Sequence, residues 1–350
     1  MFDLDSALRI VHERKGSDLH LCTGDLPMAR VIGELESVSG TKLTREDMDA
    51  VIEKIASERH KVQLKEKGET DLRYEIPGLA GYRVNIFQTI TGPAAAFREI
   101  PTVIPTLEEL GLPSSLSDLA MLNSGLVLLV GATGSGKSTA TAALVNYANE
   151  HRREHILTIE DPIEFRYESM GCMVSQREVG LHTTSFPAAL RVALREDADI
   201  VVVGEMRDRE TVRLAIEAAE TGHLVFATLH TRTTPQAIDR IIAIFPEGEQ
   251  QQIRMVLADA LKAVLSVSLM KRCDRKGRVQ AMEIMRVNGA IRNLIREGKT
   301  PQIANAIQTG RAHGMRTMDD ALKELLDNGI ISRETAAHYA REMDFLGNRI

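Results

Sequence analysis

The sequence contains no tryptophan, and aromatic residues make up only 4% of its 350 residues. Proteins that bind single-stranded nucleic acid stack the bases on aromatic side chains, and such side chains are scarce here. The formal net charge of −6 counts against broad binding to nucleic acid, which needs a basic surface. A basic channel inside a ring of subunits stays compatible with this charge. We therefore expect no nucleic-acid partner.

Cysteine is also scarce. The three cysteines, Cys22, Cys172 and Cys273, lie far apart and form no C-x-x-C pair. Neither a disulfide framework nor a zinc site is indicated by this spacing. The pattern is typical of idle or buried thiols in a reducing cytosol.

Long apolar runs are absent too. The opening residues, MFDLDSALRIVHERKG, lack the apolar core of a signal peptide, and no run of about 18 apolar residues occurs elsewhere. We expect a cytoplasmic protein with no transmembrane helix, whose association with a membrane would come through a partner. The opening residues instead predict a helix with one apolar face, formed by Leu4, Ala7, Leu8 and Val11.

What the sequence does contain is a phosphate-binding loop. Residues 131–138 read GATGSGKS and match the pattern G-x-x-x-x-G-K-[ST]. The run LVLLV before the loop predicts a buried parallel strand, and the residues after it have helical composition. In this setting, successive backbone N–H groups and a helix N-terminus bind phosphates. We expect the ATP-binding residues to be Gly131, Ala132, Thr133, Gly134, Ser135, Gly136, Lys137, Ser138 and Thr139.

Two side chains of the loop are expected to have distinct roles. Lys137 would reach the β- and γ-phosphates, and the hydroxyl of Ser138 would ligate Mg²⁺. The order of the glycines does not match G-x-G-x-x-G, so a dinucleotide-binding fold is not the competing interpretation.

Polar groups follow four short apolar segments that predict strands. These segments are 126–130, 155–159, 199–203 and 223–229. The first is followed by the phosphate loop, and the others by EDPIEF (160–165), GEMRD (204–208) and His230. Because the carboxyl ends of parallel strands meet at one edge of a sheet, we expect these groups to converge on one nucleotide.

Glu205 is the strongest catalytic candidate after the loop. ATP hydrolysis needs a water in line with the γ-phosphate, and a carboxylate at a strand end can hold it. Glu164 is expected to orient this water or to join the Mg²⁺ shell, while Glu160 and Asp161 place the loop. His230 is expected to donate to the γ-phosphate and to report its loss. The alternative for each is an ordinary role at a strand end or in a turn.

Hydrolysis at a P-loop usually also needs an arginine from a neighbouring element, whose positive charge stabilises the transition state. Arg83 and Arg98 flank the last strands of the first domain, where domain closure would bring them over the phosphates. Arg191 and Arg195 are predicted to share a helical face before the Glu205 strand. A surface ion pair is the alternative for every one of them.

The composition divides the chain into consecutive regions. Residues 1–98 predict a small α+β domain, and 99–113, with three prolines, predict a linker. Residues 114–288 alternate strand and helix as an α/β domain does, and 289–350 are mostly helical by composition. Within the first domain we expect strands at 17–21 and 29–38, a helical stretch at 44–66, and a hairpin of 71–76 with 82–90.

Taken in order, these motifs make the chain resemble the type IV pilus retraction ATPases of the secretion-ATPase superfamily, over nearly its whole length. The shared segments are SDLHL (17–21), GATGSGKST (131–139), IEDPIEF (159–165), LREDADIVVVGEMRD (194–208), TGHLVFATLHT (221–231) and AIRNLIREGK (290–299). The extension ATPases of that superfamily carry a longer N-terminal region and a four-cysteine zinc segment, which are missing here. Gly81, where another arginine is expected, and Ala198, which replaces a usual proline, are small departures.

The resemblance implies a fold and an activity. The fold is α/β, with a RecA-like P-loop ATPase core, a smaller N-terminal α+β (PAS-like) domain and a helical C-terminal region. The activity is hydrolysis of ATP with Mg²⁺ by a homohexamer that powers pilin disassembly and twitching motility. By the motif match Glu205 is the catalytic base, and the site is completed by Glu164, His230, Arg83 and Arg98. AIRNLIREGK is implied to serve retraction rather than nucleotide binding.

The resemblance also implies partners and a location. The ring docks on the inner-membrane platform protein at the cytoplasmic base of the pilus, alongside other pilus ATPases. Three alternatives stay open: a nucleic-acid translocase or secretion ATPase on the same core, a scaffold that binds ATP without hydrolysing it, and an accessory retraction protein. ATPase activity stimulated by nucleic acid would identify the first, and Glu205 with Glu164 argues against the second.

Overall fold

The computed structural model describes residues 2–31, 33–100 and 103–341. Contacts within the chain divide it into two units, Met1–Val103 and Ile104–Ile350, each with its own hydrophobic core. Residues 101–102 of the predicted linker and 342–350 of the predicted helical region lie outside the described residues. Among the described residues, no helix is both long and apolar enough to cross a bilayer.

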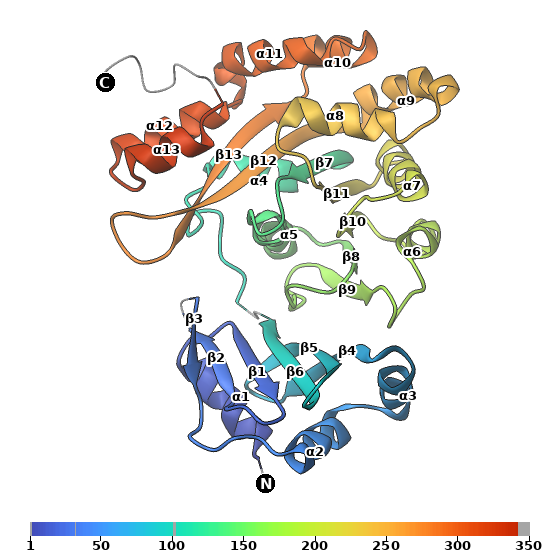
Figure 1. Ribbon diagram of the computed structural model, residues 1–350. Helices are drawn as coiled ribbons and strands as arrows, with labels where there is room; N and C mark the ends of the chain where they lie inside the picture. The colour runs from blue at the N-terminus through green and yellow to red at the C-terminus, as the bar shows by residue number, and fades with distance from the viewer. Residues whose placement is uncertain (1, 32, 101–102, 342–350) are drawn as a thin grey trace. The chain divides into compact units, whose positions relative to one another are not determined.

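The small unit is built on an antiparallel sheet with the strand order β3-β2-β1-β6-β5-β4 (Figure 1). Side chains alternate across it, so that Leu19, Val84 and Phe97 are buried beneath the helices while Arg83 and Arg98 are exposed. The strands are β1 (Asp18–Cys22), β2 (Met28–Val31), β3 (Glu34–Ser37), β4 (Glu69–Ile76), β5 (Ala80–Thr89) and β6 (Gly92–Ile100). The helices are α1 (Leu4–Glu13), α2 (Arg45–Ile55) and α3 (Glu58–Lys67).

The opening helix is confirmed, with the side chain of Asp3 accepting N–H groups at its start and the four apolar residues buried. The expected hairpin is confirmed as β4 and β5. The helical stretch predicted at 44–66 consists of two helices, because α2 ends at Ile55 and Ser57 caps α3. The boundary predicted at residue 98 is wrong, since β6 continues to Ile100 within the sheet.

The large unit is built on a sheet with the order β13-β12-β7-β11-β10-β8-β9. All neighbouring strands are parallel except the edge strand β13, which is antiparallel to β12. The strands are β7 (Gly125–Val130), β8 (His155–Glu160), β9 (Met173–Glu178), β10 (Ile200–Val203), β11 (Leu224–Leu229), β12 (Leu261–Lys271) and β13 (Arg278–Arg286). The four predicted strands are therefore confirmed as β7, β8, β10 and β11.

Helices cover both faces of this sheet. The face that carries Leu128 packs against α6 (Phe186–Ala193), α7 (Arg209–Glu220), α8 (Thr234–Ala243), α9 (Glu247–Ala260), α10 (Gly289–Arg296) and α11 (Ile303–Thr309). The opposite face, which carries Leu129, packs against η1 (Ser114–Leu116), α4 (Ser117–Ala120) and α5 (Lys137–His151). Short turns η2 (Thr300–Gln302) and η3 (Arg311–His313) flank α11. This double covering explains why the central strands are apolar throughout.

The C-terminal helices α12 (Met318–Asp327) and α13 (Arg333–Tyr339) form a separate small core with the β12–β13 hairpin. The signature segment 290–299 contains all of α10 except its first residue, and in this helix Ile291 and Ile295 are fully buried while Leu294 packs partly against the same core. This segment therefore presents an apolar face that packs into the core of the large unit.

Candidate active site

The groups at the carboxyl ends of the strands line one cavity of about 330 Å³. The phosphate loop follows β7, Glu160 and Glu164 come from the end of β8, Glu205 follows β10 and His230 follows β11. The convergence predicted from the strand ends is therefore observed within the large unit. Asp161, Ser138 and Thr139 also line this cavity.

The phosphate loop leads directly into α5, whose N-cap residue is Gly136 with φ of 93°. This left-handed backbone conformation favours glycine, and a Cβ at Gly136 would lie 2.3 Å from Nε2 of Gln280, so that this side chain would have to move. Gln280, on β13, donates from Nε2 to the carbonyl of Gly136 at 3.2 Å. The first N–H groups of α5 have no partner within the helix and are suited to bind phosphate oxygens.

Lys137 is folded back over this loop. Only 7% of its surface is exposed, and Nζ donates to the carbonyls of Gly131 at 2.9 Å and Ala132 at 3.0 Å. Burial lowers the pKa of Lys137, and the nearby carboxylates of Glu205 and Glu164 partly oppose this effect. A nucleotide phosphate would offer the amine a better partner than two neutral carbonyls.

Glu205 is held between two side chains. Its Oε2 lies 2.7 Å from Nη2 of Arg207, and its Oε1 lies 3.0 Å from Nε2 of His230. The Nδ1 of His230 lies 3.4 Å from Nζ of Lys137. A neutral imidazole with its proton on Nε2 satisfies both contacts, since it donates to Glu205 and accepts from Lys137. The structure thus connects Lys137, His230 and Glu205 in one polar chain.

Glu160 fixes the acidic loop that follows β8. Its carboxylate accepts hydrogen bonds from the Thr158 hydroxyl at 2.7 Å, from Nε2 of Gln176 at 3.3 Å and from the backbone N–H of Glu164 at 3.3 Å. Desolvation of this site raises the pKa of Glu160 to about 6. The carboxylate therefore holds the backbone at Glu164 in position.

The shifted pKa of Glu160 predicts a pH-dependent stability. Because the folded-state pKa of about 6 exceeds the ordinary value of 4.5, the stabilisation is complete below pH 4.5 and is lost as pH rises through about 6. Position 160 does not titrate in Glu160→Gln. Between about pH 4.5 and about pH 7.5, the free energy of unfolding of the wild type should therefore fall by about 2 kcal/mol relative to that of the variant. Denaturant unfolding of both proteins at both pH values measures this difference. If the free energy of unfolding changed with pH in the same way in both proteins, this would contradict the raised pKa of Glu160.

The residues expected to ligate Mg²⁺, Ser138 and Glu164, both line the cavity. Hydroxyl and carboxylate oxygens suit this hard cation, which usually keeps several waters and binds through one or two carboxylates together with substrate phosphates. Within the described part of the chain, no cluster of three or more His, Cys, Asp or Glu side chains is arranged to hold a metal. The oxygen donors present fit an ion that arrives with the nucleotide.

Other candidates lie outside the cavity lining. Gly131, Ala132 and Ser135 face a second cavity, which Thr133 and Gly134 share with the first. In this second group the backbone N–H of Gly131 donates to the carbonyl of Leu229 at 3.4 Å, and that of Ser135 donates to the carbonyl of Ala132 at 3.2 Å.

The arginine candidates have varied surroundings. Arg83 and Arg98 are cross-strand neighbours in the small unit, and Nε of Arg98 donates to the buried Asp18 at 2.8 Å. Their catalytic role stays a prediction. Arg191 forms an ion pair with Glu210. The shared helical face predicted for Arg191 and Arg195 is wrong, because α6 ends at Ala193.

Sequence reasoning missed three residues at the site: Arg207, Arg278 and Gln280. Arg207 lies in the GEMRD segment, only two residues after Glu205, so the sequence contained a signal that this arginine could contact Glu205. Arg278 lines the nucleotide cavity from the start of β13, and Gln280 supports the loop from the same strand. No motif marks β13, so sequence alone gave no reason to choose them.

Comparison with known proteins finds relatives that match nearly the whole chain. The chain is 47% identical to the type IV pilus retraction ATPase PilT of Pseudomonas aeruginosa over 339 residues, which is 97% of this chain and 98% of that protein. It is 46% identical to a twitching motility protein of Neisseria gonorrhoeae over 318 residues, which is 91% of this chain and 85% of that protein.

The fold agrees as well. A crystal structure of the pilus retraction motor PilT with bound ADP superimposes with a TM-score of 0.92 at 40% identity and covers 98% of both chains. The expected α/β ATPase core with a smaller N-terminal domain is thereby confirmed. The family model described as "Type II/IV secretion system protein" matches residues 81–344. The chain therefore belongs to the type II/IV secretion system protein family.

Proposed function

We propose that this protein is the ATPase that powers retraction of type IV pili, and so supports twitching motility. The observation that carries the proposal is the cavity where Lys137, His230 and Glu205 form one polar chain beside the phosphate loop. Similarity to a pilus retraction ATPase over nearly the whole chain supports the same conclusion.

ATP binds with its phosphates on the loop. The N–H groups of the loop and of the first turn of α5 receive the phosphate oxygens, and Lys137 exchanges its two carbonyl partners for the β- and γ-phosphates. The γ-phosphate then replaces Glu205 as the acceptor of the Nε2 proton of His230. Glu205 is thereby released from His230.

Glu205 then acts as the general base. It holds a water in line with the γ-phosphorus and accepts a proton from it as the new P–O bond forms and the bond to ADP breaks. Mg²⁺, when bound, neutralises charge on the phosphates. Ser138 and Glu164 are the residues that would hold it.

The motor works as a homohexamer on the cytoplasmic face of the inner membrane, docked on the platform protein of the pilus and acting alongside other pilus ATPases. Arg83 and Arg98 supply positive charge to the phosphates. Membership of the secretion family and the exposure of both arginines support this arrangement. Turnover then depends on contact between domains or subunits.

The function is tested in cells. Labelled pili should extend but no longer retract when the gene is deleted, and twitching should stop. Wild-type protein should restore retraction, whereas Glu205→Gln should not. Pili that retract at the wild-type frequency without this protein would contradict the proposal.

The arginine role predicts a kinetic effect. Arg83→Ala and Arg98→Ala should each lower kcat of the purified ATPase by about tenfold while changing KM for ATP by less than about threefold, because the charge acts mainly in the transition state. Arg9→Ala is the matched control, since Arg9 is an exposed arginine on α1, which packs on the other face of the sheet.

Arg98 needs a further control because it also pairs with Asp18. Asp18→Asn breaks this ion pair while keeping the arginine, so it separates a loss of stability from a loss of charge at the phosphates. Unchanged kcat in both alanine variants would place the catalytic arginines elsewhere.

A further inference from the structure

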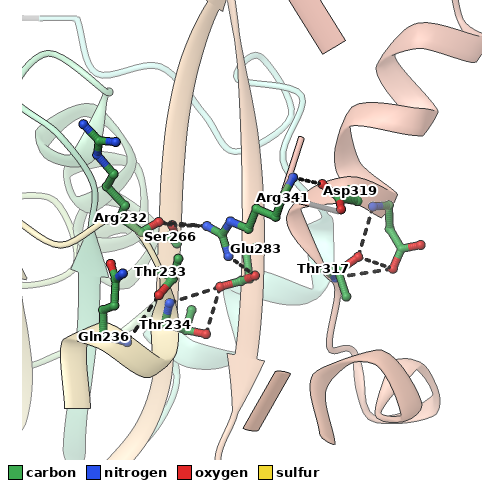
Figure 2. A network of polar contacts seen from close by, with 10 residues as sticks. Arg232, Thr233, Thr234, Gln236, Ser266, Glu283, Thr317, Asp319 and Arg341 are labelled. Carbon is green, nitrogen blue, oxygen red and sulfur yellow. Dashed lines mark hydrogen bonds and ion pairs between the residues drawn. The ribbon is translucent and has the colours of Figure 1, made fainter. Parts of the chain in front are cut away.

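The C-terminal helices are joined to the rest of the large unit in two ways. Their apolar side chains, including Met318, Leu322 and Ala336, pack with Met270 and Val279 of the β12–β13 hairpin. After α13 the chain then reaches Arg341, which lies among polar side chains of other elements (Figure 2). The apolar packing anchors the helices, so the polar link at Arg341 calls for a separate explanation.

Arg341 makes four polar contacts. Its Nη1 forms an ion pair with Oε2 of Glu283, and its Nη2 donates to the carbonyl of Arg232 at 2.8 Å and to Oγ of Ser266 at 3.0 Å. Its backbone N–H donates to Oδ1 of Asp319 at 2.8 Å. A planar guanidinium can satisfy several acceptors in fixed directions, which makes this contact directional as well as ionic.

Glu283 continues the network to α8. Its side chain is only 7% exposed, and Oε1 accepts hydrogen bonds from the backbone N–H of Thr234 at 3.1 Å and from the Thr234 hydroxyl at 2.9 Å. A carboxylate at the first residue of a helix is stabilised by the unpaired N–H groups there. Without Arg341, however, Glu283 would remain a buried charge without its cationic partner, which is unfavourable.

These contacts hold the segment 231–233, which connects His230 to α8, at its middle residue Arg232 and at Thr234 directly after it. Arg341 and the hydroxyl of Ser266 both donate to the carbonyl of Arg232, while Glu283 holds Thr234. His230 is only two residues from Arg232. Because so little chain separates them, we expect a displacement of the Arg232 carbonyl to move the imidazole of His230 as well.

Residues 339–341, called here the C-terminal segment, also lie across a cavity from the phosphate loop. A cavity of about 510 Å³ lies between them, lined by Gly131, Ala132 and Ser135 on one side and by Tyr339 and Arg341 on the other. Arg341 does not belong to the described residues that line the nucleotide cavity. Any effect of Arg341 on hydrolysis is therefore indirect, and its hydrogen bond to the carbonyl of Arg232 offers a route through the 231–233 segment.

We propose that Arg341, together with Glu283, is a positioning residue for ATP hydrolysis. The pair holds the 231–233 segment so that His230 stays between Lys137 and Glu205, and the C-terminal segment thereby sets the rate of turnover. This inference rests on the role of His230 in the proposed function. If the pair had a purely structural role, it would hold the C-terminal segment in place without changing the chemistry at His230.

Steady-state ATPase kinetics of the purified full chain tests the inference. Arg341→Ala should lower kcat by about tenfold, within the range of coupling through packed networks, and change KM by less than about twofold. Arg341→Lys should restore part of kcat, because it keeps the charge beside Glu283 but loses the two-pronged contact. Arg311→Ala is the matched control, since Arg311 forms an exposed ion pair with Asp320 in the same region.

A double-mutant cycle separates positioning from anchoring. If Arg341 acts through His230, Arg341→Ala should slow turnover little further once His230→Ala is present. Two fully multiplicative effects would overturn the inference, as would a wild-type kcat in Arg341→Ala. His230→Ala with wild-type kcat would overturn the proposed role of His230 as well, which distinguishes the two failures.

Loss of folding is covered by a second variant. Glu283→Gln combined with Arg341→Gln removes both charges and leaves amides that can still hydrogen-bond, so no uncompensated buried charge remains. With a thermal midpoint close to that of the wild type, this double variant should still turn over about tenfold more slowly. A folded double variant with wild-type kcat would overturn the inference.

Discussion

Glu205→Gln is expected to bind ATP with nearly wild-type affinity while hydrolysis falls by at least about 10²-fold, the scale of a lost general base. The amide has the shape of the carboxylate, and its oxygen can still accept from Nε2 of His230, which lies 3.0 Å from Oε1 in the wild type. It cannot accept a proton from the attacking water. Affinity for the nucleotide is preserved because the phosphates bind to the loop and to Lys137.

Single-turnover hydrolysis and equilibrium nucleotide binding, measured on the same preparation, check this result. Glu217→Gln is the matched control, because Glu217 is an exposed glutamate on α7 that is not among the residues lining the cavity. A Glu205→Gln enzyme that hydrolyses ATP at close to the wild-type rate would remove Glu205 from the mechanism. Loss of ATP binding together with hydrolysis would indicate a structural role instead.

The part of the site that was predictable from sequence is the part with local signals. The strand, glycine loop and helix that hold Lys137 are consecutive, and each has its own pattern of residues. The acids and His230 follow short apolar strands, and parallel pairing brings those strand ends to one edge. Pattern and topology together were therefore enough to predict their convergence.

Two contacts that sequence reasoning missed join residues far apart in the chain. Gln280 supports Gly136 across 144 positions, and Arg341 reaches Arg232 across 109 positions. Which polar side chain meets which backbone group depends on the packing of the β12–β13 hairpin, and a single sequence does not encode that in any local pattern. β6 was missed for another reason, since the alanines of GPAAAFREI have weak strand preference.

Lys137→Ala is expected to impair an earlier step of the reaction than Glu205→Gln does, because it weakens the binding of the phosphates themselves. We expect kcat/KM for ATP to fall by about 10³-fold, the upper range for one preorganised donor at a developing charge. Lys137 is only 7% exposed, so its charge acts where water screens little. Burial already lowers the pKa of Lys137, so the free protein bears a cost that a bound phosphate relieves.

Lys137→Met distinguishes charge from packing, because it keeps an unbranched apolar stem beneath the carbonyls of Gly131 and Ala132 and lacks only the ammonium group. If the charge is responsible, the methionine and alanine variants should lose similar affinity in equilibrium nucleotide binding. Lys276→Ala, at an exposed lysine of the β12–β13 hairpin, should bind ATP like the wild type. Wild-type affinity in Lys137→Met would mean that the backbone N–H groups of the loop hold the phosphates without the lysine, so Lys137 would only pack the loop.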